Sequence, residues 1–339
     1  MDLILTSAGS YSRISGAHQQ HRTAWAQRDQ GALTPEQFEA VQAAVTREII
    51  QVQAEAGLDL VTDGQVRWHD PISHLAGRLD GVKINGLLRF FDTNTYFRQP
   101  VVIGRLAWRA SVAAPEYRAA VAAATRPVKP VLTGPYTLAR LSVVETDHYK
   151  KDFRALILDY AEAVAREVEA LAAAGATVIQ IDEPAILKHP KEIGLLREAV
   201  SRLAAARGTA ALALYTYFGD AAPLYSELQD LPVQMLGLDF TYGSGLVDRI
   251  VRDGAVMPLG LGLLDGRNTR LETPASVAAV LEKILPKVKS PGDGRSCALN
   301  PSCGLEYLPW EKAQAKLATM RTIKAAWLGT KSFGEGKKL

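Results

Sequence analysis

The sequence predicts a single (β/α)8 TIM barrel, an α/β fold in which eight parallel strands alternate with helices. Three observations lead to this prediction. Short apolar runs that end in polar residues recur along the chain, as is typical of parallel strands buried on both faces. Amphipathic helical stretches separate nearly all of these runs. The length of 339 residues suits one barrel with insertions.

A helix with both ends marked runs from Thr34 to Gly57. Thr34 can cap its start, a proline follows in the first turn, and Gln37 stands at the capping-box position. Gly57 lies where a left-handed residue commonly ends a helix. Between the ends, apolar residues recur at spacings of three and four: Phe38, Val41, Val45, Ile49, Val52 and Ala56. The stretch LDLVTDG follows directly and reads as a buried strand.

The same alternation continues to the C-terminal part of the chain. A second apolar stripe consists of Ile157, Tyr160, Val164, Val168 and Leu171; Gly175 ends it, and the strand TVIQIDEP follows. Helices near 193–206, 221–229, 245–252 and 274–288 lead to the strands TAALALYTYFG, VQMLGLDFTYG, AVMPLGLGLLDG and RSCALNPSCG. LILTSAGS, LVTDGQ and KPVLTGP bring the predicted strands to eight. Alternating strands and helices imply a parallel sheet, and eight such units indicate closure into a barrel.

One segment departs from this regularity. Residues 75–127 are mixed in character, and we interpret them as an insertion with a hairpin that could cap the barrel mouth. Residues 1–329 are therefore expected to form one domain. The Gly- and Lys-rich stretch 330–339 is expected to be a disordered tail.

Composition and charge exclude several classes of protein. Apolar residues make up 47% of the chain, yet no apolar run is long enough to span a bilayer, so a membrane protein is not expected. The net charge of +3 comes from 39 basic and 36 acidic residues spread along the chain, which argues against a nucleic-acid partner. The two cysteines suit a reducing compartment. The strand-like start MDLILTSAGS lacks the basic residues of a secretory signal, and a cytoplasmic location is expected.

Polar residues gather at the predicted carboxyl ends of the strands, where the active sites of such barrels lie. They are Ser10, Asp63, Gln65, Gly134, Tyr136, Asp182, Glu183, Tyr215, Tyr217, Asp239, Asp265, Asn300 and Cys303. A pair of acids at one strand end is costly to hold together, so Asp182 and Glu183 favour a binding role. The ring as a whole predicts a functional site at this end of the barrel.

Six stretches carry a resemblance to a known family. They are SAGSYSR (7–13), AGLDLVTDGQVRWHD (56–70), VLTGPYTL (131–138), AGATVIQIDEPAI (174–186), LGLGLLDGRNT (259–269) and LNPSCGL (299–305). The chain resembles the catalytic barrel of cobalamin-independent methionine synthase, and most of all its short single-barrel relatives, the core methionine synthases. The resemblance covers nearly the whole chain. It implies methionine biosynthesis by methyl transfer to the thiol of homocysteine, with a zinc ion that holds this thiol as a thiolate.

The zinc-ligand motif of that family is degenerate here. The resemblance places the family's His-x-Cys pair on Tyr215 and Tyr217 and its Glu on Asp239, while Cys303 is kept. Because a phenol has a pKa of about 10, Asp239 and Cys303 remain as the good ligands, and catalytic zinc takes three from the protein. A standard zinc site is therefore not expected. Two histidines after the second strand, His69 and His74, are candidate replacements.

The residues that hold the amino-acid substrate are better retained. The resemblance implies that Gly9 and Ser10 receive the substrate carboxylate and that Asp182 binds its ammonium group. Gln65 replaces the family's second acid; it can accept a hydrogen bond but carries no charge. The ligand is then either bound more weakly or not an α-amino acid. The family's folate-stacking tryptophan has no equivalent after GPYTL, and Trp68 and Trp310 are candidate substitutes.

Two functions follow. The first is a methyltransferase whose thiol acceptor is activated by Tyr215 or Tyr217 as hydrogen-bond donor, or by a metal brought by a partner. Its methyl donor would be methyltetrahydrofolate, a methylcorrinoid or a donor protein. The second is a zinc-free paralogue that binds an amino-acid-like ligand or catalyses a different reaction on it. Packing roles also stay open, with the tyrosines as rim plugs, Cys303 and Cys297 as core, and Asp265 in a turn.

Overall fold

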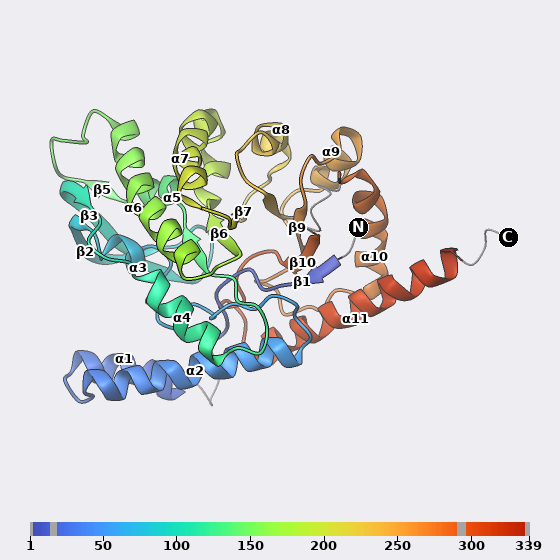
Figure 1. The fold of residues 1–339 in the computed structure, drawn as a ribbon, viewed down its shortest axis with the longest axis horizontal. Helices are drawn as coiled ribbons and strands as arrows, with labels where there is room; N and C mark the ends of the chain where they lie inside the picture. The colour runs from blue at the N-terminus through green and yellow to red at the C-terminus, as the bar shows by residue number, and fades with distance from the viewer. Residues whose placement is uncertain (1–2, 14–18, 290–295, 336–339) are drawn as a thin grey trace.

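Seven parallel strands form a curled sheet at the centre of the molecule (Figure 1). The computed structural model describes residues 3–13, 19–289 and 296–335. In order across the sheet the strands are β1 (Leu3–Leu5), β10 (Cys297–Pro301), β9 (Leu259–Leu264), β8 (Met235–Asp239), β7 (Ala211–Thr216), β6 (Val178–Asp182) and β4 (Val131–Thr133). All seven begin where the sequence predicts a strand.

The eighth predicted strand joins the two edges of this sheet. Leu60 forms a parallel bridge with Thr6, next to β1, and Val61 forms one with Val128, just before β4. The amide of Lys129 also donates to the carbonyl of Val61 at 2.8 Å. These contacts close the ring, and the predicted TIM-barrel-like fold is confirmed.

Helices follow the strands and cover the outside of the sheet (Figure 1). The α-helices are α1 (Gln19–Asp29), α2 (Pro35–Glu55), α3 (Ser73–Ala76), α4 (Ala113–Ala123), α5 (Pro135–Arg140), α6 (Phe153–Ala173), α7 (Ile193–Ala206), α8 (Tyr225–Gln229), α9 (Gly245–Asp253), α10 (Pro274–Ile284) and α11 (Trp310–Glu335). Short 3-10 helices are η1 (Pro184–Lys188), η2 (Pro190–Glu192), η3 (Ala222–Leu224) and η4 (Leu285–Lys287). No helix in the described ranges is both long and apolar enough to cross a membrane.

Helix α2 keeps its predicted ends but turns a different face to the core. The capping box between Thr34 and Gln37 is present, and Gly57 has a φ of 87°. The buried residues are Gln42, Val45, Thr46, Ile49, Ile50 and Gln53. The face is rotated because Gln53 exchanges hydrogen bonds with the backbone N–H and C=O of Thr62. A buried amide that is fully hydrogen-bonded can take a place where an apolar side chain was expected.

The segment 75–127 contains the predicted hairpin. Strands β2 (Asp80–Arg89) and β3 (Tyr96–Ala107) pair antiparallel, and β5 (Val143–Val144) adds to β3. The tip of the hairpin reaches loops at the carboxyl ends of the barrel strands. Its Asp92 accepts a hydrogen bond from Tyr242 at 2.8 Å and pairs with Arg267 at 3.1 Å. The hairpin therefore caps the barrel mouth.

The C-terminal helix α11 extends further than expected. Ala313, Leu317, Met320, Ile323 and Trp327 form a buried stripe on it at helical spacing. Because a helix elongates easily once such a face is anchored, the chain is helical to Glu335 rather than disordered from residue 330. Residues 336–339 of the predicted tail lie outside the described residues.

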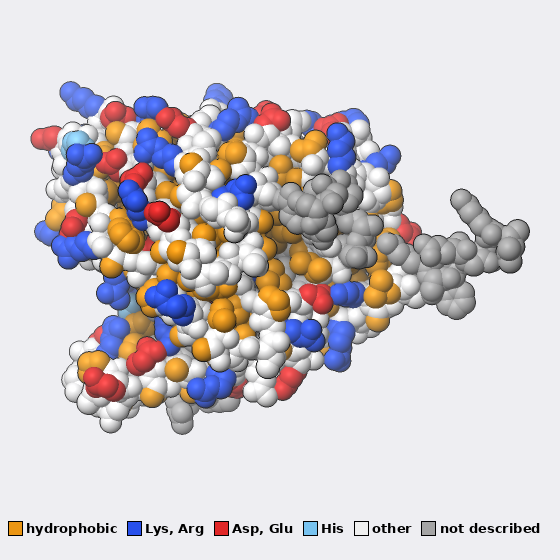
Figure 2. All heavy atoms as spheres, viewed as in Figure 1, with side chains coloured by type: hydrophobic (Ala, Val, Ile, Leu, Met, Phe, Trp, Pro, Cys, Tyr) orange, Lys and Arg blue, Asp and Glu red, His pale blue; other side chains and the backbone are white. Residues whose placement is uncertain are grey.

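Figure 2 shows basic and acidic side chains interspersed on the face in view, without a basic stripe.

An aromatic ring inside the barrel requires two glycines. Tyr215, Gly237 and Gly260 are register partners on three neighbouring strands. A Cβ added to Gly237 would lie 2.3 Å from the Tyr215 ring, and one on Gly260 would lie 2.5 Å from its hydroxyl oxygen. The pairing of one large side chain with two absent ones fills this layer of the barrel.

We predict that Gly237→Ala destabilises the protein by about 1–3 kcal/mol, because the new methyl group overlaps the buried ring of Tyr215. Urea unfolding measures the change. The same substitution at Gly194, in α7 with no atom near its Cβ, should be neutral or stabilising by up to about 1 kcal/mol. Adding Tyr215→Leu to Gly237→Ala should cost less than the sum of the two changes. Strict additivity would show that the ring is not the obstacle.

Candidate functional site

The carboxyl ends of the strands bring together side chains from four separate parts of the chain. Asp182 ends β6, Tyr217 follows β7, Asp239 ends β8 and Cys303 follows β10. Each is nearly or fully covered, with exposed fractions of 7%, 7%, 2% and 1% in that order. They form one closed group of polar side chains beneath the hairpin tip.

Asp182 accepts hydrogen bonds from two side chains, one on its own strand and one after β7. Its Oδ1 accepts from the Gln180 amide at 2.7 Å, and its Oδ2 accepts from the Tyr217 hydroxyl at 3.1 Å. Burial raises the pKa of Asp182 to about 7, against the opposing effects of these hydrogen bonds and of the charge on Lys129. Within the described part of the chain, Asp182 forms no salt bridge. The absence of a contacting cation is consistent with this raised pKa, because burial disfavours the charged form of a carboxyl group.

The loop after β1 lies beside Asp182. The Gln180 amide that donates to Asp182 also donates to the carbonyl of Ala8 at 2.7 Å. Gly9 has a φ of 141°, and a Cβ there would lie 3.8 Å from the Gln65 amide nitrogen. Gln65 itself has a φ of 52°, and its backbone N–H donates to Asp63 at 2.9 Å. The structure thus brings the predicted residues Gly9 and Gln65 together.

Ser10 and Cys303 meet through Gly304. A Cβ on Gly304 would lie 1.9 Å from the Ser10 hydroxyl, and the Leu305 N–H donates to the Ser10 carbonyl at 2.9 Å. The Cys303 thiol lies 2.9 Å from the position of a Cβ on Gly266. Burial, and next the charge of Asp239, raise the pKa of Cys303 well above its usual value. The thiol is therefore neutral and enclosed.

Asp239 accepts hydrogen bonds from two loops, its own after β8 and the one after β7. Oδ1 accepts from the backbone N–H of Thr241 at 2.8 Å and from its hydroxyl at 2.6 Å, and Oδ2 accepts from the N–H of Phe218 at 3.2 Å. Burial raises the pKa of Asp239, while these bonds and Arg267 lower it. Its carboxylate oxygens thus accept from two backbone N–H groups and one side-chain hydroxyl of the protein.

Tyr215, in β7, and Tyr217, after it, direct their hydroxyl groups to different partners. Tyr217 points to Asp182, as described above. The Tyr215 hydroxyl instead contacts the Asn300 side-chain oxygen at 3.4 Å, and its ring covers the two barrel glycines. The structure does not bring the Tyr215 hydroxyl into the group at the mouth.

These residues do not fit the zinc ion that the family resemblance implies. Catalytic zinc takes three nitrogen, sulfur or carboxylate ligands from the protein. Across the described ranges, no three His, Cys, Asp or Glu side chains lie close enough to share a metal ion. Of the candidate replacements, His69 packs on Trp25 at 3.7 Å, and His74 stacks on Trp68 at 4.7 Å. The Tyr217 hydroxyl already donates a hydrogen bond to Asp182.

Glu183 has a structural role that corrects the expectation of an acid pair at the site. Its carboxylate accepts from the N–H groups of Tyr136 and Thr137 at 2.9 and 2.7 Å, and from the Thr137 hydroxyl at 2.7 Å. It anchors the start of α5 and is fully buried. Burial raises its pKa to about 7. Tyr136 likewise donates away from the mouth, to Glu192 at 2.6 Å.

Two other expected packing roles are seen. Asp265 accepts from the N–H of Arg267 at 2.9 Å in a turn, and Cys297 is fully buried in the core. The sequence analysis does not include several residues that the structure places at or beside the site: Lys129, Gln180, Phe218, Tyr242 and Arg267. Lys129 and Gln180 lie within predicted strands, where a buried polar residue was the available signal.

A cleft of about 570 Å³ lies between α1 and β3, next to the mouth, and Figure 2 shows the surface hollowed between these elements. Trp68 lines it but is 3% exposed and donates to Glu116 at 3.0 Å. Trp310 is 7% exposed, with its ring at 84° to that of Tyr11. Neither tryptophan offers an open face for a folate ring.

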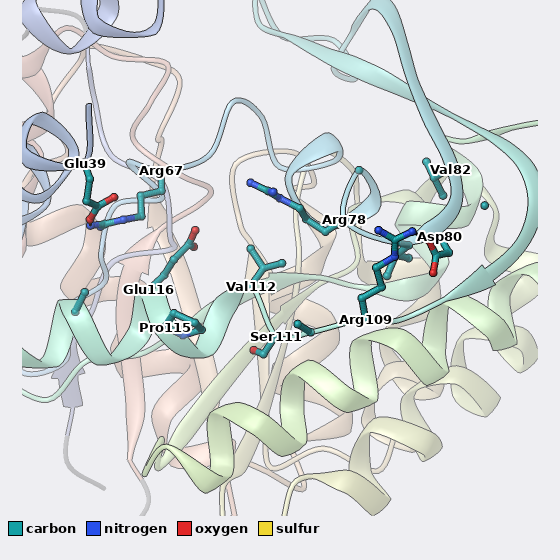
Figure 3. A pocket seen from close by; sticks show the side chains of 15 residues that line it. Glu39, Arg67, Arg78, Asp80, Val82, Arg109, Ser111, Val112, Pro115 and Glu116 are labelled. Atoms are coloured by element: carbon teal, nitrogen blue, oxygen red, sulfur yellow. Dashed lines mark hydrogen bonds and ion pairs between the residues drawn. The ribbon is translucent and has the colours of Figure 1, made fainter. Parts of the chain in front are cut away.

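A groove of about 870 Å³ lies outside the barrel, between α4 and the base of the hairpin. Figure 3 shows Arg67, Arg78 and Arg109 along it. Arg67 pairs with Glu39 and Arg109 with Asp80, so most of its charge is neutralised. The groove contains no residue of the polar ring and does not belong to the candidate site.

Comparison with known proteins places this geometry in context. Residues 3–326 match a family model described as cobalamin-independent synthase, catalytic domain. A methionine synthase of Saccharolobus solfataricus is 32% identical over 277 residues, which is 80% of each chain. One of Thermococcus kodakarensis is 28% identical and covers 86% of this chain and 85% of its own. A solved B12-independent methionine synthase from Shewanella sp. W3-18-1, in complex with selenomethionine, has 22% identity and a TM-score of 0.76, covering 98% of this chain and 99% of that one.

We predict that Gly304→Ala destabilises the protein by about 1–3 kcal/mol, because the new methyl group would displace the Ser10 hydroxyl. The double variant Ser10→Ala/Gly304→Ala should regain most of this loss, since the overlapping oxygen is gone. Urea unfolding of the two single variants and the double variant forms the cycle. A double variant as unstable as Gly304→Ala would show that the two loops do not meet here.

Proposed function

The chain belongs to the cobalamin-independent methionine synthase family, and we propose that it is a methyltransferase whose acceptor is a small sulfur-containing α-amino acid bound at the barrel mouth. Family membership supports the reaction type. The observation that carries the acceptor class is the buried Asp182 carboxylate, which has two hydrogen-bond donors but no contacting cation in the described residues. An ammonium group from the ligand supplies the missing charge.

The loop after β1 provides the opposite end of the acceptor site. Gln180 donates to both Ala8 and Asp182, so the loop and the acid are held side by side. We assign the ligand carboxylate to Gly9 and Ser10, and Gln65 beside Gly9 to a neutral contact with the ammonium group. The selenomethionine in the Shewanella enzyme supports a ligand of this class.

Activation of the acceptor thiol is assigned to Tyr217 rather than to a zinc ion. A free thiol has a pKa of about 8.5 and is a few per cent thiolate at neutral pH. When the ligand ammonium occupies Asp182, the Tyr217 hydroxyl is released to donate a hydrogen bond to the thiolate. The thiol loses its proton to solvent, and the resulting thiolate attacks the methyl carbon of the donor. The bond from that carbon to the donor breaks, and the donor leaves with the electron pair. The donor is methyltetrahydrofolate, a methylcorrinoid or a methylated partner protein.

The altered metal positions favour a second candidate, a zinc-free paralogue that catalyses a different reaction on an amino-acid-like ligand. The Tyr217 phenol and Asp239, at two of the expected ligand positions, both hydrogen-bond within the protein. Both candidates share the binding site at Asp182 and differ in whether a methyl group is transferred. A measurement of methyl-transfer activity separates them.

We predict that the protein binds L-methionine and that Asp182→Asn weakens this binding at least about 30-fold, the cost of removing one partner of a buried charge pair. Affinity should rise from about pH 6 to about pH 8, because the ligand needs the carboxylate form and the pKa of Asp182 is about 7. Calorimetry measures both effects. The exposed surface change Asp230→Asn removes the same charge and should leave affinity unchanged. Equal affinity in Asp182→Asn would remove Asp182 from the site.

We also predict that dialysed protein holds well under one equivalent of zinc, because the donor set does not fit the ion. Elemental analysis gives the zinc content, and a homocysteine methylation assay with methyltetrahydrofolate or methylcobalamin gives the activity. The first candidate expects methylation that survives chelation; the second expects methionine binding without methylation. About one equivalent of zinc that is lost in Cys303→Ala but kept in Cys297→Ala would contradict the zinc-free assignment.

A further inference from the structure

A lysine lies inside the barrel below the candidate site. Lys129, just before β4, is 2% exposed. Its Nζ donates to the Ser7 carbonyl at 2.8 Å and to the Gln180 side-chain oxygen at 2.5 Å. A buried ammonium is costly unless its donors are used, and these two contacts connect the loop after β1 to β6 across the interior.

Gln180 connects Lys129 to the candidate site, because it accepts from Lys129 and donates to Asp182. An amide has one acceptor end and one donor end, and an ammonium group can only donate. Lys129 therefore fixes the oxygen of Gln180 toward itself and turns the NH2 group the other way. That group donates to Asp182 and to the Ala8 carbonyl, each at 2.7 Å. The orientation of one amide thus sets both halves of the proposed acceptor site.

Tyr215 gives the lysine its third contact. The Lys129 Nζ lies 4.9 Å from the centre of the Tyr215 ring, within the range of a cation–π interaction. The ring is held over Gly237 and Gly260, as described above. An aromatic face in this layer stabilises a cation where water is excluded, which accounts for Tyr215 without a catalytic role for its hydroxyl.

We propose that Lys129, acting through Gln180, is a positioning residue that aligns the Asp182 carboxylate and the Ser7–Ser10 loop for the ammonium and carboxylate groups of the acceptor. The inference rests on the proposed function and deepens it. Lys129 does not touch the acceptor. Its role is to hold the two groups that do.

The arrangement has a consequence for pH. Among the described residues, the charged and titratable groups that interact electrostatically with Asp182 are Lys129, Glu183, Tyr215 and Tyr217. Burial lowers the pKa of Lys129 to about 7, and attraction to Asp182 works against this change. The same attraction holds the pKa of Asp182 down. Removal of the positive charge therefore raises the pKa of Asp182, and the carboxylate form appears only at higher pH.

The test is Lys129→Met, with calorimetry of L-methionine binding across pH. The affinity at neutral pH should fall about tenfold, and the pH at which affinity rises should move up by about one unit, since one pKa unit corresponds to a tenfold change. Lys316→Met is the matched control: this lysine is also fully buried, but it pairs with Glu272 on the outside of the barrel. It should lose stability without moving the pH dependence.

A second variant and a measurement without ligand distinguish a positioning role of Lys129 from a general folding defect. Gln180→Glu keeps an acceptor for Lys129 but cannot donate to Asp182 in its ionised form, so the pH dependence should again move upward. Carboxylate NMR of the free protein, assigned with Asp182→Asn, reports the pKa of Asp182 without any ligand. A raised pKa in Lys129→Met supports the positioning role even if wild-type protein fails to bind methionine, an outcome that overturns only the proposed acceptor. An unchanged pKa, or a pH dependence that matches the wild type, overturns the inference.

Discussion

One buried amide connects the charges on which the site depends. Gln180 accepts from Lys129 and donates to Asp182, and it does so in a barrel interior where an unpaired charge is strongly unfavourable. The loop after β1 is drawn in by the same amide and by the same lysine. Tyr215 covers the lysine, and two glycines on neighbouring strands make room for its ring. The geometry of the mouth follows from how these charges are satisfied below it.

The fold was largely predictable because its signals are local. Strand and helix alternation marks every barrel unit. The ends of α2 lie where the capping signals place them, and α7 spans the predicted residues 193–206. Tertiary context accounts for the differences. Gln53 is buried because the Thr62 backbone lies opposite it, which periodicity cannot foresee. The helix α11 runs past Thr330 because its anchoring stripe comes from packing on the barrel.

The sequence predicted which residues gather at the site better than it predicted the contacts that they make. Asp182, Tyr217, Asp239 and Cys303 were expected at the strand ends, and the structure groups them there. The sequence did not show in which direction each side chain points. Glu183 follows Asp182 in the chain, yet it faces the start of α5, since successive residues of a strand point to opposite sides. The family resemblance pairs Tyr215 and Tyr217 as candidates. Tyr215 lies within β7 opposite Gly237 and fills the barrel, whereas Tyr217 follows the end of β7 and donates to Asp182.

We propose that the family's acceptor site still binds a ligand although its metal-ligand positions are altered. In our account the acceptor is held by charge, at Asp182, and the thiolate by a phenol. The most direct test is a crystal structure of the protein with L-methionine bound. The account predicts the ligand ammonium within hydrogen-bonding distance of the Asp182 carboxylate, with the ligand carboxylate against Gly9 and Ser10. A ligand seated instead in the cleft between α1 and β3, with Tyr217 still donating to Asp182, would contradict it.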